Sequence, residues 1–113
     1  MMSDVLIVNG KPWTSDHDRL DRRALAKHEL IAQKIMKNPA LVDRAKNTLA
    51  RWKATQGGFW IQGWEKELDQ PVEAIARFLR EQSDYATELR QTSPFVGTLS
   101  PEEIQAINAA HRS

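Results

Sequence analysis

The stretch NPALVDRAKNTLARWKATQGG, residues 38–58, carries a start signal, an amphipathic body and a stop signal for one helix. Asn38 suits the N-cap position and Pro39 the first helical position, while the paired glycines Gly57 and Gly58 are typical of a helix end. Between these signals apolar side chains recur at helical spacing on one face, at Leu41, Val42, Ala45, Leu49 and Trp52. The stretch therefore predicts an amphipathic helix over residues 39–55.

The segments on both sides repeat this helical pattern. Upstream, Thr14 or Ser15 is suited to cap a helix that runs to about residue 38. Downstream, we expect short helices over 59–67, from about 71 and from Ser83, and a last one opened by a capping box of Ser100 and Glu103. No strand pattern alternates with them. The sequence predicts an all-α fold, a single compact bundle of about five or six short helices forming one domain over residues 19–113.

Residues 1–18 are predicted to form a separate N-terminal arm. The short β-branched run over residues 5–8 is followed by Asn9 and Gly10, which is a strong two-residue turn signal. The returning side is short and contains Pro12. We therefore expect either a short β-hairpin or an extended arm, with pairing to a partner's sheet edge as a third option.

Composition narrows the class of protein. The chain has 113 residues and no cysteine, which excludes disulfides and thiolate metal sites. No apolar run approaches the roughly 18 residues needed to span a membrane, and the N-terminus lacks the basic segment of a signal peptide. We expect a cytoplasmic protein without a membrane partner.

Charge is distributed unevenly along the chain. Residues 19–56 contain ten Lys and Arg against three Asp and Glu, whereas residues 57–113 contain five against nine. The first segment is therefore net +7 and the second net −4, and with net −2 for residues 1–18 they sum to the overall +1. Such asymmetry steers charged partners, so we expect a bundle with oppositely charged poles.

Signals for catalysis are sparse. His28 and Glu29 begin like a zinc-protease motif, but Ala32 stands where the second histidine is required, and no P-loop or nucleophile elbow is present. We expect no metal, no cofactor and no enzymatic activity. One weaker pattern remains, because Arg23 and His28 have the R-x4-H spacing that resembles the motif of HEPN ribonucleases, which are small all-α proteins.

Two groups of residues are candidates for binding. The basic helix over residues 39–55 could contact nucleic acid phosphates, or an acidic protein, through its polar side chains, which are Arg44, Lys46, Asn47, Arg51 and Lys53. The aromatic segment and the later turn-rich loop could supply anchors and acidic contacts for a protein partner, at Phe59, Trp60, Trp64, Glu67, Asp69, Pro94 and Phe95. The aromatic residues could equally be core.

Several blocks of the sequence are similar to those of small bacterial antitoxin-type proteins encoded beside a toxin gene. These blocks are Asn47–Trp52, Trp64–Leu68, Pro71–Val72 and above all Leu89–Glu103. The resemblance covers roughly residues 20–110. It implies a non-enzymatic protein that binds and neutralises a cognate toxin or enzyme. Acidic residues such as Glu65, Glu67, Asp69 and Glu73 could cover a phosphate-binding active site of that partner, or the basic half could dock on an acidic partner. A nucleic-acid-binding module that uses the basic helix is the alternative, and a HEPN-like ribonuclease is a third interpretation.

Overall fold

The computed structural model describes residues 12–111, with side chains described from Leu20 onward. Of the expected N-terminal hairpin or arm over residues 1–18, residues 1–11 lie outside this range and residues 12–18 belong to the first helix. The described chain forms six helices and contains no strand, which confirms the all-α expectation. The helices are α1 (Pro12–Lys37), α2 (Ala40–Thr55), α3 (Phe59–Leu68), α4 (Val72–Leu79), α5 (Asp84–Arg90) and α6 (Pro101–Ala110).

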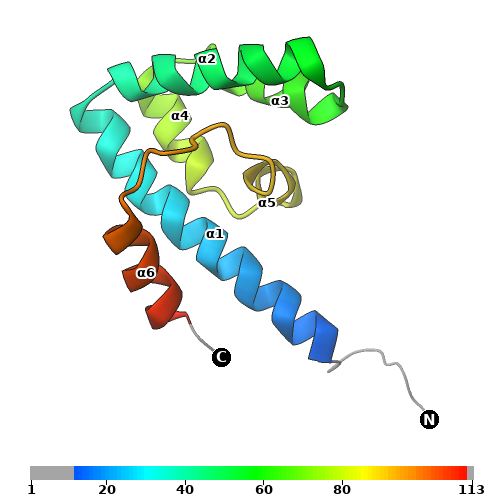
Figure 1. The fold of residues 1–113 in the computed structure, drawn as a ribbon, viewed down its shortest axis with the longest axis vertical. Helices are drawn as coiled ribbons and strands as arrows, with labels where there is room; N and C mark the ends of the chain where they lie inside the picture. Colours follow the sequence, from blue (N-terminus) through cyan, green and yellow to red (C-terminus); the bar gives the residue numbers. More distant parts are fainter. Residues whose placement is uncertain (1–11, 112–113) are drawn as a thin grey trace.

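The long helix α1 is the spine against which the other elements pack (Figure 1). Helix α4 makes the most extensive contact with it, and α5 and α6 also pack on α1. Helices α2 and α3 run antiparallel to each other across one end of α1 (Figure 1). Within the described residues, no helix has both the length and the apolar character needed to cross a membrane.

Helix boundaries follow the local signals closely, with one correction. Pro39, not Asn38, takes the N-cap position of α2, and it provides no side-chain cap. After α2 the backbone at Gly58 has a φ of 154°, and a Cβ there would lie 2.5 Å from Trp60 Nε1. A side chain at residue 58 would therefore clash as well as strain the backbone, so glycine is needed for the turn into α3.

The core is one apolar cluster to which α1–α5 contribute buried side chains. Its fully buried large residues are Trp64, Ile35, Leu68, Ile75, Leu79, Leu89 and Pro94. Helix α6 differs, because none of its residues is fully buried and only Ile104 and Ile107 pack against the cluster. Since helical stability comes mostly from packing of the apolar face, α6 is the helix that depends most on its cap.

The predicted capping box at the start of α6 is confirmed. Ser100 Oγ accepts a hydrogen bond from the Glu103 amide at 3.1 Å, and Glu103 Oε1 accepts one from the Ser100 amide at 2.8 Å. The same carboxylate oxygen lies 2.6 Å from Lys34 Nζ on α1. The hydrogen bonds from Lys34 and from the Ser100 amide lower the pKa of Glu103 below its usual value.

Replacing Ser100 with alanine is expected to cost about 1 kcal/mol of helix stability, because one amide of the first turn loses its acceptor. Because α6 is shallowly packed, the loss should appear as faster hydrogen exchange in α6 and not in α4. Gln105→Ala, an exposed change on the same helix, is the matched control. Uniformly faster exchange in α4 and α6 would show that α6 does not open separately.

Candidate functional site

Three of the predicted partner-binding residues belong to the core. Trp64 has no exposed surface, Phe95 is 6% exposed and Pro94 is fully buried. The Trp64 indole donates a hydrogen bond to the Leu89 carbonyl at 2.9 Å and meets the rings of Phe78 and Phe95 edge-on, at centroid distances of 5.7 and 6.1 Å. Because the loop after α5 folds back onto α3, these three side chains are not on the surface of the folded chain.

Phe59 and Trp60 lie nearer the surface, at the first turn of α3. Phe59 is 68% exposed, the largest value among the exposed large apolar side chains of the described chain. Trp60 is half-buried and meets Trp52 of α2 edge-on at 5.8 Å. Of the predicted aromatic anchors, Phe59 is therefore the one whose ring is free to enter a partner.

The predicted acidic contacts separate onto two sides of α3. Glu67 is half-buried, and its carboxylate lies 3.4 Å from the Tyr85 hydroxyl of α5. Asp69 is exposed and borders a hollow of about 230 Å³ between α2 and α3. This α2–α3 hollow is lined by Lys46, Leu49, Ala50, Glu65, Leu68 and Asp69. Its floor is apolar and its rim is charged, as in many protein-binding surfaces.

The basic residues predicted as one nucleic-acid-binding set divide between two faces of α2. Arg44, Asn47 and Arg51 follow the i, i+3, i+7 spacing of one face. They border a groove of about 350 Å³, here called the α2–loop groove, which is lined by Arg44, Asn47, Thr48, Arg51, Trp52 and Val96. Lys46 instead lines the α2–α3 hollow, and Lys53 pairs with Glu65 of α3 at 2.9 Å. The five residues therefore do not form a single patch.

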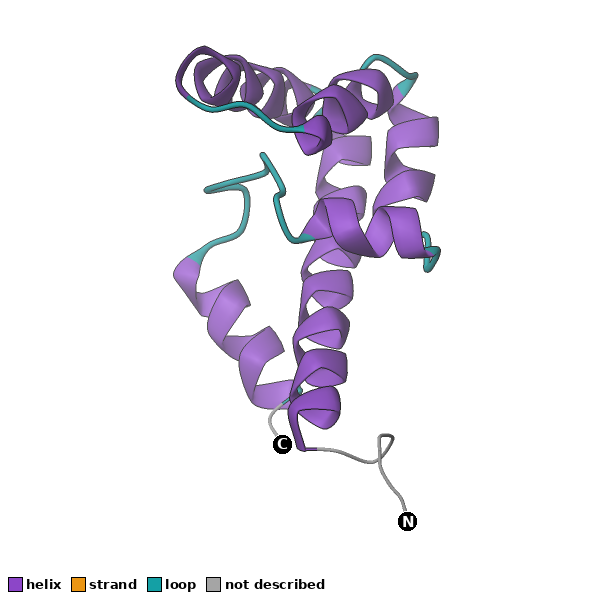
Figure 2. Cartoon of the chain, turned by 90° about the vertical axis from the view of Figure 1, so that its right-hand side faces the viewer, coloured by secondary structure: helices purple, strands orange, loops and turns teal. Residues whose placement is uncertain are grey.

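The second wall of this groove is the loop over residues 91–100, which runs beneath the α2–α3 pair (Figure 2). Val96 is 63% exposed, whereas its neighbour Phe95 is buried in the core. Gly97 has a φ of 78°, and a Cβ at this position would lie 3.7 Å from the Arg44 guanidinium. Sequence reasoning missed this wall, because turn signals locate a loop but not the helix on which it lies.

His28 holds this loop to α1. It is 5% exposed, and its Nδ1 lies 2.7 Å from the Ala24 carbonyl while Nε2 lies 2.8 Å from Ser93 Oγ. In the neutral imidazole, Nδ1 donates to the Ala24 carbonyl and Nε2 accepts from the Ser93 hydroxyl. Burial lowers the pKa of His28 to about 4. Both ring nitrogens are engaged in hydrogen bonds within the fold, whereas the ribonuclease interpretation based on Arg23 and His28 needs an imidazole that can reach RNA.

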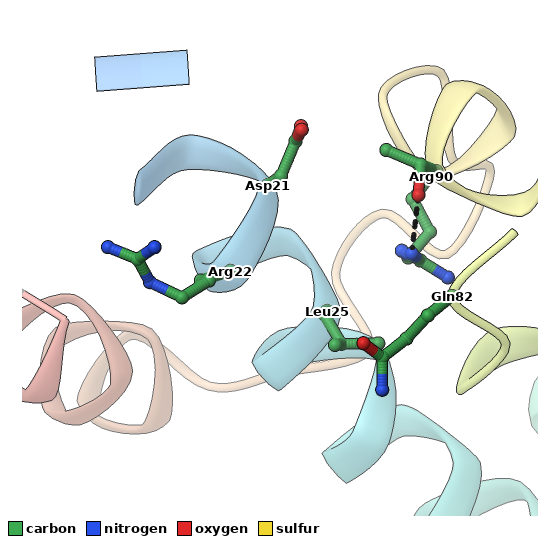
Figure 3. Close-up of a pocket in the computed structure, with 6 residues that line it drawn as sticks. Asp21, Arg22, Leu25, Gln82 and Arg90 are labelled. Atoms are coloured by element: carbon green, nitrogen blue, oxygen red, sulfur yellow. Dashed lines mark hydrogen bonds between the residues drawn. The ribbon is translucent and has the colours of Figure 1, made fainter. Parts of the chain in front are cut away.

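A smaller hollow of about 160 Å³ lies between α1 and α5 (Figure 3). Arg90 lines it with Asp21, Arg22, Leu25, Gln82 and Thr87. Arg90 is 5% exposed and donates hydrogen bonds to the Leu79 and Glu81 carbonyls and, at 3.1 Å, to Thr87 Oγ1. Burial lowers its pKa, while the charge of Asp21 acts in the opposite direction. These bonds tie α5 to the end of α4, so we assign Arg90 a structural role.

Neither a metal site among the described side chains nor a similar known protein points to a particular reaction. Within the residues that the structure describes, no three His, Asp or Glu side chains gather in a way that could hold a metal ion. No protein-family model, curated protein or solved structure matches the chain significantly.

Proposed function

We propose that this chain is a non-enzymatic protein-binding partner of the antitoxin type, which binds and restrains a cognate toxin or enzyme. The observation that carries the proposal is the exposure of Phe59 at the tip of the α2–α3 pair. The Phe59 ring is 68% exposed, so most of its apolar surface remains in water in the free protein. Its burial in a partner would contribute roughly 2 kcal/mol from the apolar surface removed from water.

The surroundings of Phe59 have the composition of a binding rim. Gln62 and Lys66 are exposed on the same face of α3, and Asp69 follows farther along it at the edge of the α2–α3 hollow. An aromatic anchor enclosed by polar residues that exclude water is the usual arrangement of a binding hot spot. The complementary partner surface would offer an apolar pocket for the ring and polar or basic groups beside it.

Charge would affect the rate of association with the partner more than the affinity of the complex. The net +7 and net −4 segments of the chain are partly neutralised where they meet, through Lys34 with Glu103 and Lys53 with Glu65. The exposed pair of Lys53 with Glu65 adds little stability, and both pairs reduce the field available for long-range steering. We therefore expect the rate of dissociation, set by Phe59, to be the more sensitive quantity.

The test is co-expression with the product of the adjacent gene, followed by purification of the complex and measurement of its dissociation constant. Phe59→Ala is expected to weaken the complex by about 30-fold, as a loss of roughly 2 kcal/mol at a hot spot implies. The melting temperature of the free Phe59→Ala variant should stay near that of the free wild type, because the ring contributes little to the core.

Leu20→Ala is the matched control, because Leu20 is 59% exposed on α1, outside the α2–α3 pair. It should leave the complex unchanged. Failure of the wild type to form any complex or to relieve growth inhibition would overturn the proposal. Equal weakening by Phe59→Ala and Leu20→Ala would show that Phe59 is not the anchor.

A further inference from the structure

A second binding site is indicated by the α2–loop groove, which lies on the side of α2 away from the α2–α3 hollow. We propose that this groove binds a segment of unpaired nucleic acid, RNA or DNA, with its arginines on the phosphates and its apolar residues against a base. The inference does not depend on the protein partner, because neither Phe59 nor the polar residues of its rim line the groove.

The two arginines of the groove are available to an anion. In the described part of the chain neither Arg44 nor Arg51 has a carboxylate within ion-pair distance, whereas Lys34 and Lys53 do. Arg51 Nη2 donates to Thr48 Oγ1 at 3.3 Å, which orients the guanidinium without neutralising it. A guanidinium presents a planar set of donors that matches phosphate oxygens in pairs, so these arginines suit a phosphodiester.

Apolar surface completes the site. Trp52 is half-buried, supported edge-on by Trp60, and lines the groove together with the exposed Val96. Aromatic side chains beside a cationic track are typical of proteins that bind single strands, because a base can lie against the ring whatever its identity. Asn47, between the arginines, offers both a donor and an acceptor to a base edge.

The shape of the groove favours an unpaired strand over a duplex. A recognition helix must be free to enter a major groove about 12 Å wide. Here α3 packs along one side of α2 and the 91–100 loop runs beneath the α2–α3 pair (Figure 2). Val96 of that loop faces the basic side chains across the groove, which leaves less room there than an open helix face would. A recess of about 350 Å³ is of the size that accepts a small ligand or one flipped nucleotide.

The loop that walls the groove is held firmly enough to present Val96 outward. Ser93 is bonded to His28, and its Oγ also accepts from the Phe95 amide at 3.3 Å. The Phe95 ring is anchored in the core against Trp64. Because these fixed points immediately precede Val96, the groove exists before any ligand arrives, which lowers the cost of binding.

The experiment is fluorescence anisotropy of the full chain with labelled oligouridylate and oligothymidylate of about ten nucleotides, and with a labelled DNA duplex. Measurements at about 50 mM and 200 mM salt should show affinity for a single strand that falls steeply as salt rises. The double variant Arg44→Gln, Arg51→Gln is expected to weaken binding by about tenfold or more. A preference between the two single strands would identify RNA or DNA as the ligand.

The matched control is the double variant Lys46→Gln, Lys53→Gln, which removes the same charge from the other face of α2 and should weaken binding by less than about threefold. Val96→Glu tests the loop wall, and we expect a loss of about fivefold or more from an added negative charge at an exposed position. Equal losses in the two double variants, tighter binding of the duplex, or no binding at low salt would each overturn the proposal. Equal affinity for a labelled oligoglutamate would assign the groove to an acidic protein segment instead.

Discussion

Replacing Trp64 with alanine is expected to lower the free energy of unfolding by about 3–5 kcal/mol, the largest loss from any single substitution proposed for this chain. The indole has no exposed surface and lies between the rings of Phe78 and Phe95. Its removal leaves a cavity and also deprives the buried Leu89 carbonyl of its indole donor. Since domains of this size are stable by only about 5–15 kcal/mol, a substantial part of the variant would be unfolded at elevated temperature.

Urea unfolding followed by circular dichroism provides the measurement. Trp64→Phe should lose less than Trp64→Ala, because it keeps a ring in the cavity and gives up mainly the hydrogen bond. Trp60→Ala is the matched control, since Trp60 is only half-buried and packs at the edge of the core cluster beside Trp52. A loss at Trp60 equal to that at Trp64 would contradict the assignment of Trp64 as the centre of the core.

The free energy of unfolding is expected to fall by on the order of 3 kcal/mol between pH 6.5 and pH 4 because of His28 alone. Burial lowers the pKa of this histidine from 6.5 to about 4 in the folded protein. Between these two values the unfolded chain binds a proton that the folded chain does not. Acidification therefore favours unfolding, and the stability is present above pH 6.5 and lost as the pH falls toward 4.

The pKa of Glu103 is also lowered in the folded protein, so its contribution to the free energy of unfolding is likewise lost as the pH falls. The contribution of His28 must therefore be measured separately. The comparison is between the wild type and His28→Gln, each unfolded in urea at pH 7 and at pH 4.5. We expect a smaller pH-dependent loss in the variant, whatever its stability at pH 7. Equal losses in the two proteins would show that His28 does not titrate as a buried neutral group.

The helices were predictable because their signals are local. Apolar spacing, the glycine pair after α2, and the serines that cap α5 and α6 each act within a few residues. Pro39 shows the limit of such signals, because the turn between α1 and α2 places it at the N-cap that asparagine would usually occupy. The expectation of a helix beginning near Thr14 is close to the observed start at Pro12.

The division between core and surface in the aromatic segment was not predictable from spacing. Trp60 and Trp64 are four residues apart, yet only Trp64 is enclosed, because Phe95 covers it from a loop thirty-one positions later in the chain (64 to 95). The division of the basic residues was more accessible, since Arg44, Asn47 and Arg51 share one helical spacing and Lys46 and Lys53 share another. The wall formed by the 91–100 loop requires a long-range contact that no periodicity reveals.

Charge in the chain is also less separated in space than along the sequence. Lys34 meets Glu103 and Lys53 meets Glu65, so members of the basic and acidic segments lie side by side. The expectation of two cleanly opposed poles is therefore wrong for these residues. Among the described residues, the arginines of the α2–loop groove stay outside such pairs, so their charge remains available at the groove.

Phe95 and Val96 are consecutive residues in opposite environments: the Phe95 side chain is buried in the core and the Val96 side chain is exposed to solvent. One peptide unit joins the two, so the position of Val96 depends on the placement of Phe95 in the core. A ligand bound against Val96 requires Phe95 to be in its place in the core, so it binds the folded chain and not the unfolded one. Such a ligand would raise the melting temperature of the protein. Conversely, a substitution that weakens the packing of Phe95 would leave Val96 less well placed at the groove. Such a substitution would reduce the affinity for a ligand that it does not contact.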